Sequence, residues 1–236
     1  MTVISPVSDR RTVIALLLLT FATGLVDAVS VLFLGHVFVA NMTGNVIFLG
    51  FWFVPHSEVD LAAAVVAFAS FVLGTIIGGR FARHLEHDVR RWLTAAMGTE
   101  VVLLAVLSLL AGTGVLHYHG SGRLVLIAGL AVTFGNQAAT ARQFGIQELS
   151  TTVLTSTIVG LGVDSRLAGG SGKREKLRYA TIFTMLSGAV VGATLTTFAV
   201  APVIALAACV VAASLGVFRS GGREATSHSS DGVCNR

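Results

Sequence analysis

The stretch from His36 to Gly50 reads HVFVANMTGNVIFLG and is apolar at both ends and polar in the middle. Asn41, Thr43 and Asn45 lie two residues apart, with Gly44 among them. Inside a membrane, each amide or hydroxyl needs a hydrogen-bond partner within the protein, and a glycine lets a backbone or a ligand come close. The pattern predicts a broken or irregular segment that lines a polar space. A polar seam between packed helices is the alternative.

The composition indicates a polytopic membrane protein. Of the 236 residues, 54% are hydrophobic and 12% are charged, and the mean hydropathy is +0.82; soluble domains are about 25% charged. The net charge is +4, and the basic residues gather in loops and at the chain ends without interleaved aromatic residues, which fits membrane orientation rather than nucleic-acid binding. The two cysteines, Cys209 and Cys234, form no CxxC pair, so we expect no disulfide framework, no metal and no cofactor.

Long apolar runs predict an all-α transmembrane helical bundle with about six spans. They cover residues 13–35, 61–79, 92–116, 124–141, 179–200 and 203–218. Two further segments, 36–54 and 144–162, are polar at their centres. The expected organisation is a basic lead at 1–12, one transmembrane domain at 13–218 and a disordered tail at 219–236.

The distribution of basic residues predicts the topology. Basic residues gather in four segments: the lead, the loops at 80–91 and 163–178, and the tail. Basic segments of membrane proteins face the cytoplasm, so we expect all four there. The loop at 55–60 is acidic and is expected outside. An odd number of membrane crossings must connect the cytoplasmic lead to the outside loop at 55–60, but two apolar segments, 13–35 and 36–54, lie between them. The same conflict recurs in the second half of the chain. Both conflicts vanish if 36–54 and 144–162 are re-entrant, which leaves both termini in the cytoplasm.

The two halves of the chain resemble each other. Residues 41–45 followed by VIFLG align with residues 153–157 followed by IVGLG, and 70–79 align with 184–193. The offsets are about 112 to 114 residues. The second pair of segments contains matching GxxxG motifs, Gly74/Gly78 and Gly188/Gly192. With three spans in each half, repeat one (about 13–116) and repeat two (about 124–218) must have opposite orientations, as inverted repeats of transporters do.

Three sequence blocks point to a known family. They are GLVDAVSVLFLGHVFVANMTGNVIFLG, GNQAATAR and TTVLTSTIVGLG. In these blocks the chain resembles the YoaK-type family of bacterial integral membrane proteins, over roughly residues 11–218. The resemblance implies a multi-pass inner-membrane protein with about six spans. It implies no substrate and no catalytic residues.

Four polar residues in the predicted spans are candidates for function. A carboxylate as deep as Asp27 is costly in a membrane, so it is usually paired, neutral or functional. It is a candidate for ion or proton coupling; alternatively it caps the break before the next segment or pairs with Arg142. Glu100, about two turns into its span, is a second coupling candidate or reaches the interface. The side-chain amides of Asn136 and Gln137 can bind a polar solute. Alternatively, they form hydrogen bonds with backbone groups that the broken segments leave without helical partners.

These features predict a small secondary transporter or permease for a small polar or charged solute in the bacterial cytoplasmic membrane. The alternative is a non-transporting bundle that docks a partner protein or a lipid. No enzyme motif is present, so we expect no enzyme. The expected partners are the lipid bilayer, the solute and a second copy of the chain, but no nucleic acid. The predicted site lies between the halves and is lined by Asp27, Asn41, Thr43, Asn45, Asn136, Gln137, Thr155 and Thr157.

Overall fold

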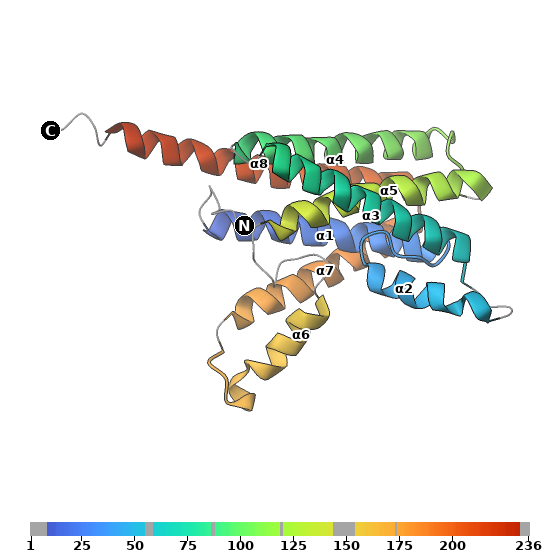
Figure 1. Cartoon of the computed structure of the whole chain (residues 1–236), viewed down its shortest axis with the longest axis horizontal. Coiled ribbons are helices and arrows are strands. Elements are labelled where there is room, and N and C mark those ends of the chain that lie inside the picture. The colour runs from blue at the N-terminus through green and yellow to red at the C-terminus, as the bar shows by residue number, and fades with distance from the viewer. Residues whose placement is uncertain are drawn as a thin grey trace.

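The computed structural model describes residues 9–54, 59–85, 88–118, 120–143, 154–172 and 174–231. Within these ranges the regular structure is entirely helical, as predicted, with six long and two short α-helices (Figure 1). In chain order the helices are α1 (Asp9–Phe33), α2 (Met42–Gly50), α3 (Leu61–His84), α4 (Val89–Gly112), α5 (Gly120–Arg142), α6 (Leu154–Val163), α7 (Glu175–Thr196) and α8 (Val200–Asp231).

The six long helices are apolar and long enough to cross a membrane. Their apolar portions are 21 to 24 residues long. At about 1.5 Å per residue, each of them covers the hydrocarbon core of about 30 Å. The number of long apolar helices thus equals the predicted number of spans, and the chain is a multi-pass membrane protein.

The two short helices, α2 and α6, fall in the two segments with polar centres. Helix α2 has nine residues and continues into a 3-10 turn, η1 (Phe51–Phe53), whereas α6 has ten residues. Ten residues rise only about 15 Å, half of the hydrocarbon core, so neither α-helix crosses a membrane by itself. Residues 144–153 of the second segment lie outside the described residues.

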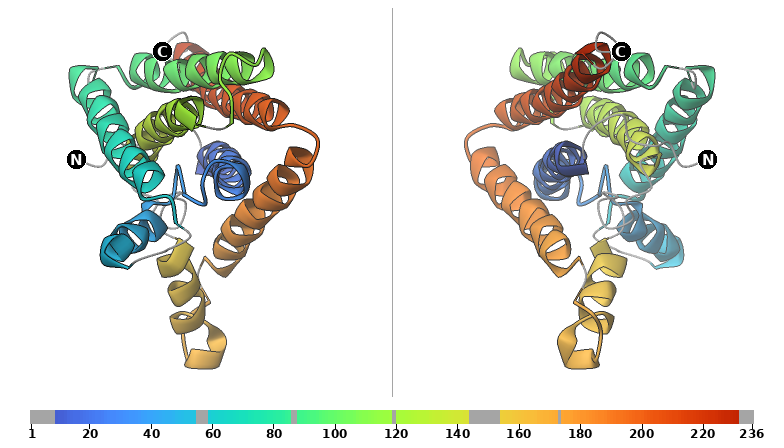
Figure 2. Two further views of the ribbon diagram at one scale, coloured as in Figure 1. Left: turned by 90° about the vertical axis from the view of Figure 1, so that its right-hand side faces the viewer. Right: turned by 90° about the vertical axis from the view of Figure 1, so that its left-hand side faces the viewer.

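Helices α1 and α5 form the centre of the bundle. The apolar stretch of each is 61% buried inside the protein, against 22% to 44% for the other four long helices. Figure 2 shows α1 and α5 surrounded by α3, α4, α7 and α8, with α2 and α6 together on the remaining side. The polar residues in the middle of α1 and α5 are therefore buried in protein rather than exposed to lipid.

Helix α7 crosses α1 in backbone contact. A Cβ atom at Gly188 would lie 2.3 Å from the carbonyl oxygen of Phe21, and one at Gly192 would lie 2.5 Å from that of Leu25. On the facing side, a Cβ atom at Gly24 would lie 2.3 Å from the carbonyl oxygen of Met185. Only glycines allow two helices to approach this closely.

Helix α3 crosses α5 in the same way. A Cβ atom at Gly74 would lie 2.1 Å from the carbonyl oxygen of Val132, and one at Gly135 would lie 2.2 Å from that of Phe71. At Gly78 the nearest backbone atom, the carbonyl oxygen of Asn136, would be 3.0 Å away. The prediction that both GxxxG motifs pack against another helix is thus confirmed.

The last helix is longer than the sequence predicted. We expected the final span to end at residue 218 and a disordered tail to follow, but α8 continues to Asp231. An established helix extends at little cost, because each added residue also adds one hydrogen bond, and polar residues outside the membrane do not interrupt it. Residues 232–236 lie outside the described residues, as do residues 1–8 of the predicted lead.

Candidate functional site

The chain breaks after α1 and continues through buried, irregular backbone. It turns at Gly35 (φ 100°) and His36 (φ 57°), both in the left-handed region, and α2 begins at Met42. Leu34, Val37, Val39 and Ala40 in this connection are fully or almost fully buried. Backbone that is neither helix nor strand is tolerated at such a place only when other groups satisfy its N–H and C=O groups.

Asp27 supplies the missing acceptors for this connection. Its Oδ1 atom accepts hydrogen bonds from the backbone N–H groups of Val39 (3.0 Å) and Ala40 (2.9 Å). Its Oδ2 atom accepts a hydrogen bond from the Asn41 side-chain amide. Arg142 is exposed, and no ion pair links it to Asp27 in the described structure. Of the structural alternatives for Asp27, capping of the break is therefore realised and pairing with Arg142 is not.

Asn45 holds the same connection from the other side. Its side chain is fully buried, and its Oδ1 atom accepts from the N–H of Phe38 at 2.9 Å while its Nδ2 atom donates to the C=O of Phe38 at 2.6 Å. Gly44 leaves room for the Phe38 ring, because a Cβ atom there would lie 2.5 Å from ring atom Cε2. Thr43 is exposed on the outside of α2. Asp27, Asn41 and Asn45 together form what we call the outer brace of α2.

Asn136 and Gln137 lie in a different layer of the bundle. Asn136 donates from Nδ2 to the carbonyl oxygen of Ala96 on α4 at 3.0 Å. Gln137 donates from Nε2 to Thr23 Oγ1 at 3.0 Å and to the carbonyl oxygen of Leu19 at 3.4 Å, both on α1. Leu19 and Thr23 precede Asp27 by two turns and one turn of α1, a rise of about 6–12 Å. The two amides are thus not part of the outer brace.

Four buried side-chain oxygen atoms on α4 and α5 have no hydrogen-bond partner among the described residues, and they are the only side-chain oxygens of this kind there. The residues that carry them are at most 4% exposed. Because α4 and α5 run antiparallel, Glu100, one turn beyond Ala96, and Thr140, one turn beyond Asn136, lie on opposite sides of the Ala96–Asn136 contact along the helices. We call these residues the inner polar residues: Glu100 (Oε1), Asn136 (Oδ1), Gln137 (Oε1) and Thr140 (Oγ1).

Helix α6 is held by an arginine that the sequence analysis did not single out. Arg178 on α7 is buried, donates from Nη1 to the carbonyl oxygen of Gly160 at 2.6 Å, and pairs through Nη2 with Asp164 at 2.6 Å. Thr155 on α6 is exposed and Thr157 is buried. Arg178 belonged to a loop interpreted as cytoplasmic and basic, so nothing in the sequence distinguished it from its solvated neighbours.

An ion pair at the opposite end was also not predicted. Asp60 caps α3 by accepting from the N–H of Ala63 at 3.0 Å, and it also pairs with Arg123 at the beginning of α5. The pair therefore joins two helices from different halves of the chain. Both side chains are 27% exposed, so we expect only a modest contribution to stability.

The eight residues predicted to line one site are therefore distributed over several places. Asp27, Asn41 and Asn45 meet in the outer brace, whereas Asn136 and Gln137 are neighbours on α5 that donate to two different helices, α4 and α1. Asp27, Asn136 and Gln137 lie on long helices, as predicted, but their partners lie on other helices or in irregular backbone. Thr43, Thr155 and Thr157 lie on the two short helices.

Comparison with known proteins identifies relatives. Residues 15–217 match the family described as "Protein of unknown function (DUF1275)". The chain is 33% identical over 175 residues to the UPF0700 transmembrane protein YoaK of Bacillus subtilis (strain 168), a match that covers 72% of this chain and 74% of the relative. No solved structure matches the chain.

Proposed function

The chain belongs to the YoaK-type family of transmembrane proteins, DUF1275, and from this premise we propose that it is a secondary transporter of a small polar or charged solute. The observation that carries the proposal is the pair of short helices inside the membrane domain. Each of them follows one of the two central helices, and each is too short to span. Transporters bind solutes and ions at such interrupted helices.

The way the two short helices are arranged supports this function. In Figure 1, α2 and α6 begin near the middle of the bundle and run toward opposite ends. Their N-terminal ends, which carry a partial positive charge, thus lie near mid-length of the long helices (Figure 1). The C-terminal ends lie toward the two membrane surfaces, as expected of two re-entrant segments with opposite orientations.

The glycine contacts support an inverted repeat of three spans in each half. Gly24 packs on the segment around Gly188, and Gly135 packs on the segment around Gly74. Exchanging the halves converts the α1–α7 crossing into the α5–α3 crossing, so the same contact is made twice. Two equivalent crossings of this kind allow one half to rock against the other around a central site, which is how inverted repeats alternate access.

Within this proposal the two polar layers have different tasks. The outer brace holds the connection before α2 in place. The part of the solute path that this connection lines therefore keeps its shape. Asn136 and Gln137 are buried, and their amide oxygens, which have no partner among the described residues, can accept hydrogen bonds from a solute. We assign no enzymatic step to any of these residues.

A reconstitution experiment tests transport. Purified protein in liposomes should give saturable currents on a solid-supported membrane, or counterflow, with at least one solute from a panel of small amines, amino acids, organic acids and polyols. Gln137→Leu should reduce the signal at least about tenfold, because an interaction worth roughly 1.4 kcal/mol or more is lost. Glu175→Gln, which changes a charge at the start of α7, serves as the control. A full panel without any signal would contradict transport.

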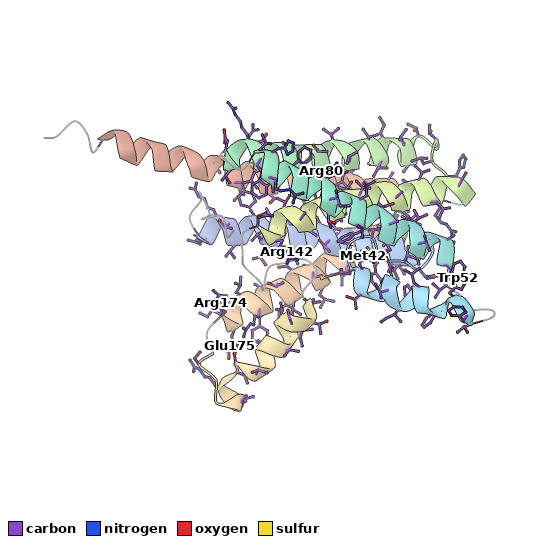
Figure 3. All side chains as sticks on the ribbon, viewed as in Figure 1. Met42, Trp52, Arg80, Arg142, Arg174 and Glu175 are labelled. Atoms are coloured by element: carbon purple, nitrogen blue, oxygen red, sulfur yellow. The ribbon has the colours of Figure 1, made fainter. Side chains whose placement is uncertain are left out.

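The topology is a separate prediction. We propose that both termini and the α3–α4 connection face the cytoplasm of a bacterium, because the basic side chains gather there. Figure 3 shows Arg142 and Arg174 in the part of the molecule toward which α8 ends, away from Trp52. With Cys209 and Cys234 replaced, Arg83→Cys should resist an impermeant maleimide in intact cells, and Thr113→Cys should react with it. The reverse pattern would invert the orientation.

One observation favours the alternative of a docking bundle. Helix α6 stands away from the central helices (Figure 2), and its residues Ile158, Val159 and Val163 are more than half exposed. A lipid or a partner helix can cover this surface. A docking bundle would form a stable complex without solute-driven currents, so the same reconstitution separates the two functions.

A further inference from the structure

Glu100 places a carboxyl group in the middle of a membrane span. The apolar portion of α4 runs from Arg91 to Gly112, so nine of its residues precede Glu100 and twelve follow it. These correspond to a rise of about 14 Å and about 18 Å, which puts the residue near the centre of the hydrocarbon core. The side chain is 1% exposed, so it does not reach the interface, which was one of the two alternatives for this residue.

No described group bonds to this carboxyl group. Its Oε1 atom is shielded from solvent and has no hydrogen-bond partner among the described residues. The ion pairs of the described structure do not include Glu100. The Nδ2 group of Asn136, a donor on α5 one turn away along α4, is bound to the carbonyl oxygen of Ala96 instead. The carboxyl group is therefore buried without a donor that could stabilise a negative charge.

The described parts of the helices packed against α4 place no charge beside Glu100. These helices are α3, α5 and α8, and their membrane stretches, residues 61–79, 124–141 and 200–218, contain no charged side chain. Cys209 is the only titratable side chain in these stretches, and it is exposed. Nearer the helix ends, the described cationic side chains are exposed or, for Arg123, paired with Asp60: Arg80, Arg83, His84, Arg123, Arg142 and Arg219.

We propose that Glu100 is a proton-binding site inside the membrane domain. A carboxylate at this depth, without a counter-ion or a hydrogen-bond donor in the described structure, is strongly disfavoured relative to the neutral acid, because burial penalises the charged form. Glu100 therefore holds a proton in the state that the structure shows. It releases this proton only when α4 moves away from its neighbours and water reaches the carboxyl group.

The proton is the cation that this residue can bind by itself. A metal ion needs several ligand atoms, and among the described residues no three His, Cys, Asp or Glu side chains come together to hold one. A proton needs the carboxylate alone. Binding of the proton is independent of transport, whereas any coupling of the proton to solute movement rests on the proposed function.

Infrared spectroscopy of the purified, detergent-solubilised full chain at neutral pH tests the protonation state. A neutral carboxylic acid has a C=O stretching band at a higher frequency than the bands of a carboxylate. The difference between the native chain and Glu100→Gln should contain the acid band and no carboxylate bands. Glu175→Gln at the start of α7 is the matched control and should remove carboxylate bands only. Carboxylate bands from Glu100, or a native spectrum without any acid band, would overturn the proton site.

Thermal unfolding at different pH values tests the same residue through stability. The folded chain keeps a proton that an unfolded glutamate releases near neutral pH, so this contribution to stability is present at low pH and is lost as the pH rises. One such proton changes the unfolding equilibrium tenfold for each pH unit, and between about pH 6 and about pH 8 it should lower Tm by about 3–6 °C per unit. Glu100→Gln should lack this part of the slope, and Glu175→Gln should keep it.

A second variant covers the case in which Glu100→Gln does not fold. Glu100→Met replaces the carboxyl group by an apolar one of similar length, and it should lose the same part of the pH slope. A slope in either folded variant equal to that of the native chain would overturn the assignment to Glu100.

The same preparation separates this site from transport. An acid band that Glu100→Gln removes, without any solute-driven current, would support the proton site and contradict the transporter. A solute-driven current without this band would support the transporter and overturn the proton site.

Discussion

Replacing Gly188 by leucine should nearly abolish the recovery of folded protein from membranes, and replacing Gly74 by leucine should do the same. Any Cβ atom at these positions would lie 2.3 Å from the carbonyl oxygen of Phe21 or 2.1 Å from that of Val132. These neighbours are backbone atoms, so no side-chain rotation relieves the clash. Overpacking of a soluble core costs about 1–3 kcal/mol when side chains can adjust; separating two helices along a whole crossing should exceed that range.

The measurement is the monodisperse yield in size-exclusion chromatography, with thermal unfolding of whatever is recovered. Gly98→Leu on α4 is the matched control, because a Cβ atom at Gly98 meets nothing within 4 Å. If the halves are an inverted repeat, Gly188→Leu and Gly74→Leu should be equally damaging. A normal yield for either variant would mean that its crossing does not require contact between backbones.

The crossings also show what the sequence could predict. Small-residue pairs spaced four apart indicate that a helix face is packed closely, and hydropathy alone gives the six spans, because both signals repeat within one helix. No comparable pattern within one helix identifies the helix that it packs against. Gly24 and Gly135 complete the two crossings, yet each is a single glycine in an apolar run, and only the three-dimensional arrangement shows what it faces.

The candidate residues show the same limit. Depth in the membrane made Asp27 conspicuous, but whether it caps a break, pairs with Arg142 or serves an ion depends on where residues 39–41 fold back. That path is set by the left-handed turn at Gly35 and His36. The sequence-based prediction placed all of these polar residues in the lining of a single site. Hydrogen bonding in the structure instead separates an outer brace, whose side-chain bonds go to the protein itself, from the inner polar residues, whose side-chain oxygens have no partner among the described residues.

Asp27→Ala should produce the second large loss of stability. The change removes both carboxylate oxygens, and with them the acceptors for the N–H groups of Val39 and Ala40 and for the Asn41 side chain. Each buried donor left without a partner costs roughly 1–3 kcal/mol, so a loss on the order of 3 kcal/mol or more is expected. Thermal unfolding in detergent measures it, and hydrogen exchange should increase at residues 39–41 before the rest of the chain unfolds.

A pair of substitutions identifies the cause. Asp27→Asn keeps one acceptor oxygen for the two backbone N–H groups but turns its own NH₂ group toward that of Asn41, so two donors face each other and stability should fall. Adding Asn41→Asp restores a donor opposite an acceptor and should recover most of the loss. Arg142→Gln should be neutral alone and should not rescue Asp27→Asn, because Arg142 is exposed and does not pair with Asp27. Rescue by Arg142→Gln, or none by Asn41→Asp, would contradict the brace. If the carboxylate of Asp27 also couples ions, the exchanged pair should fold yet lose ion-dependent activity, since the charge then sits on α2.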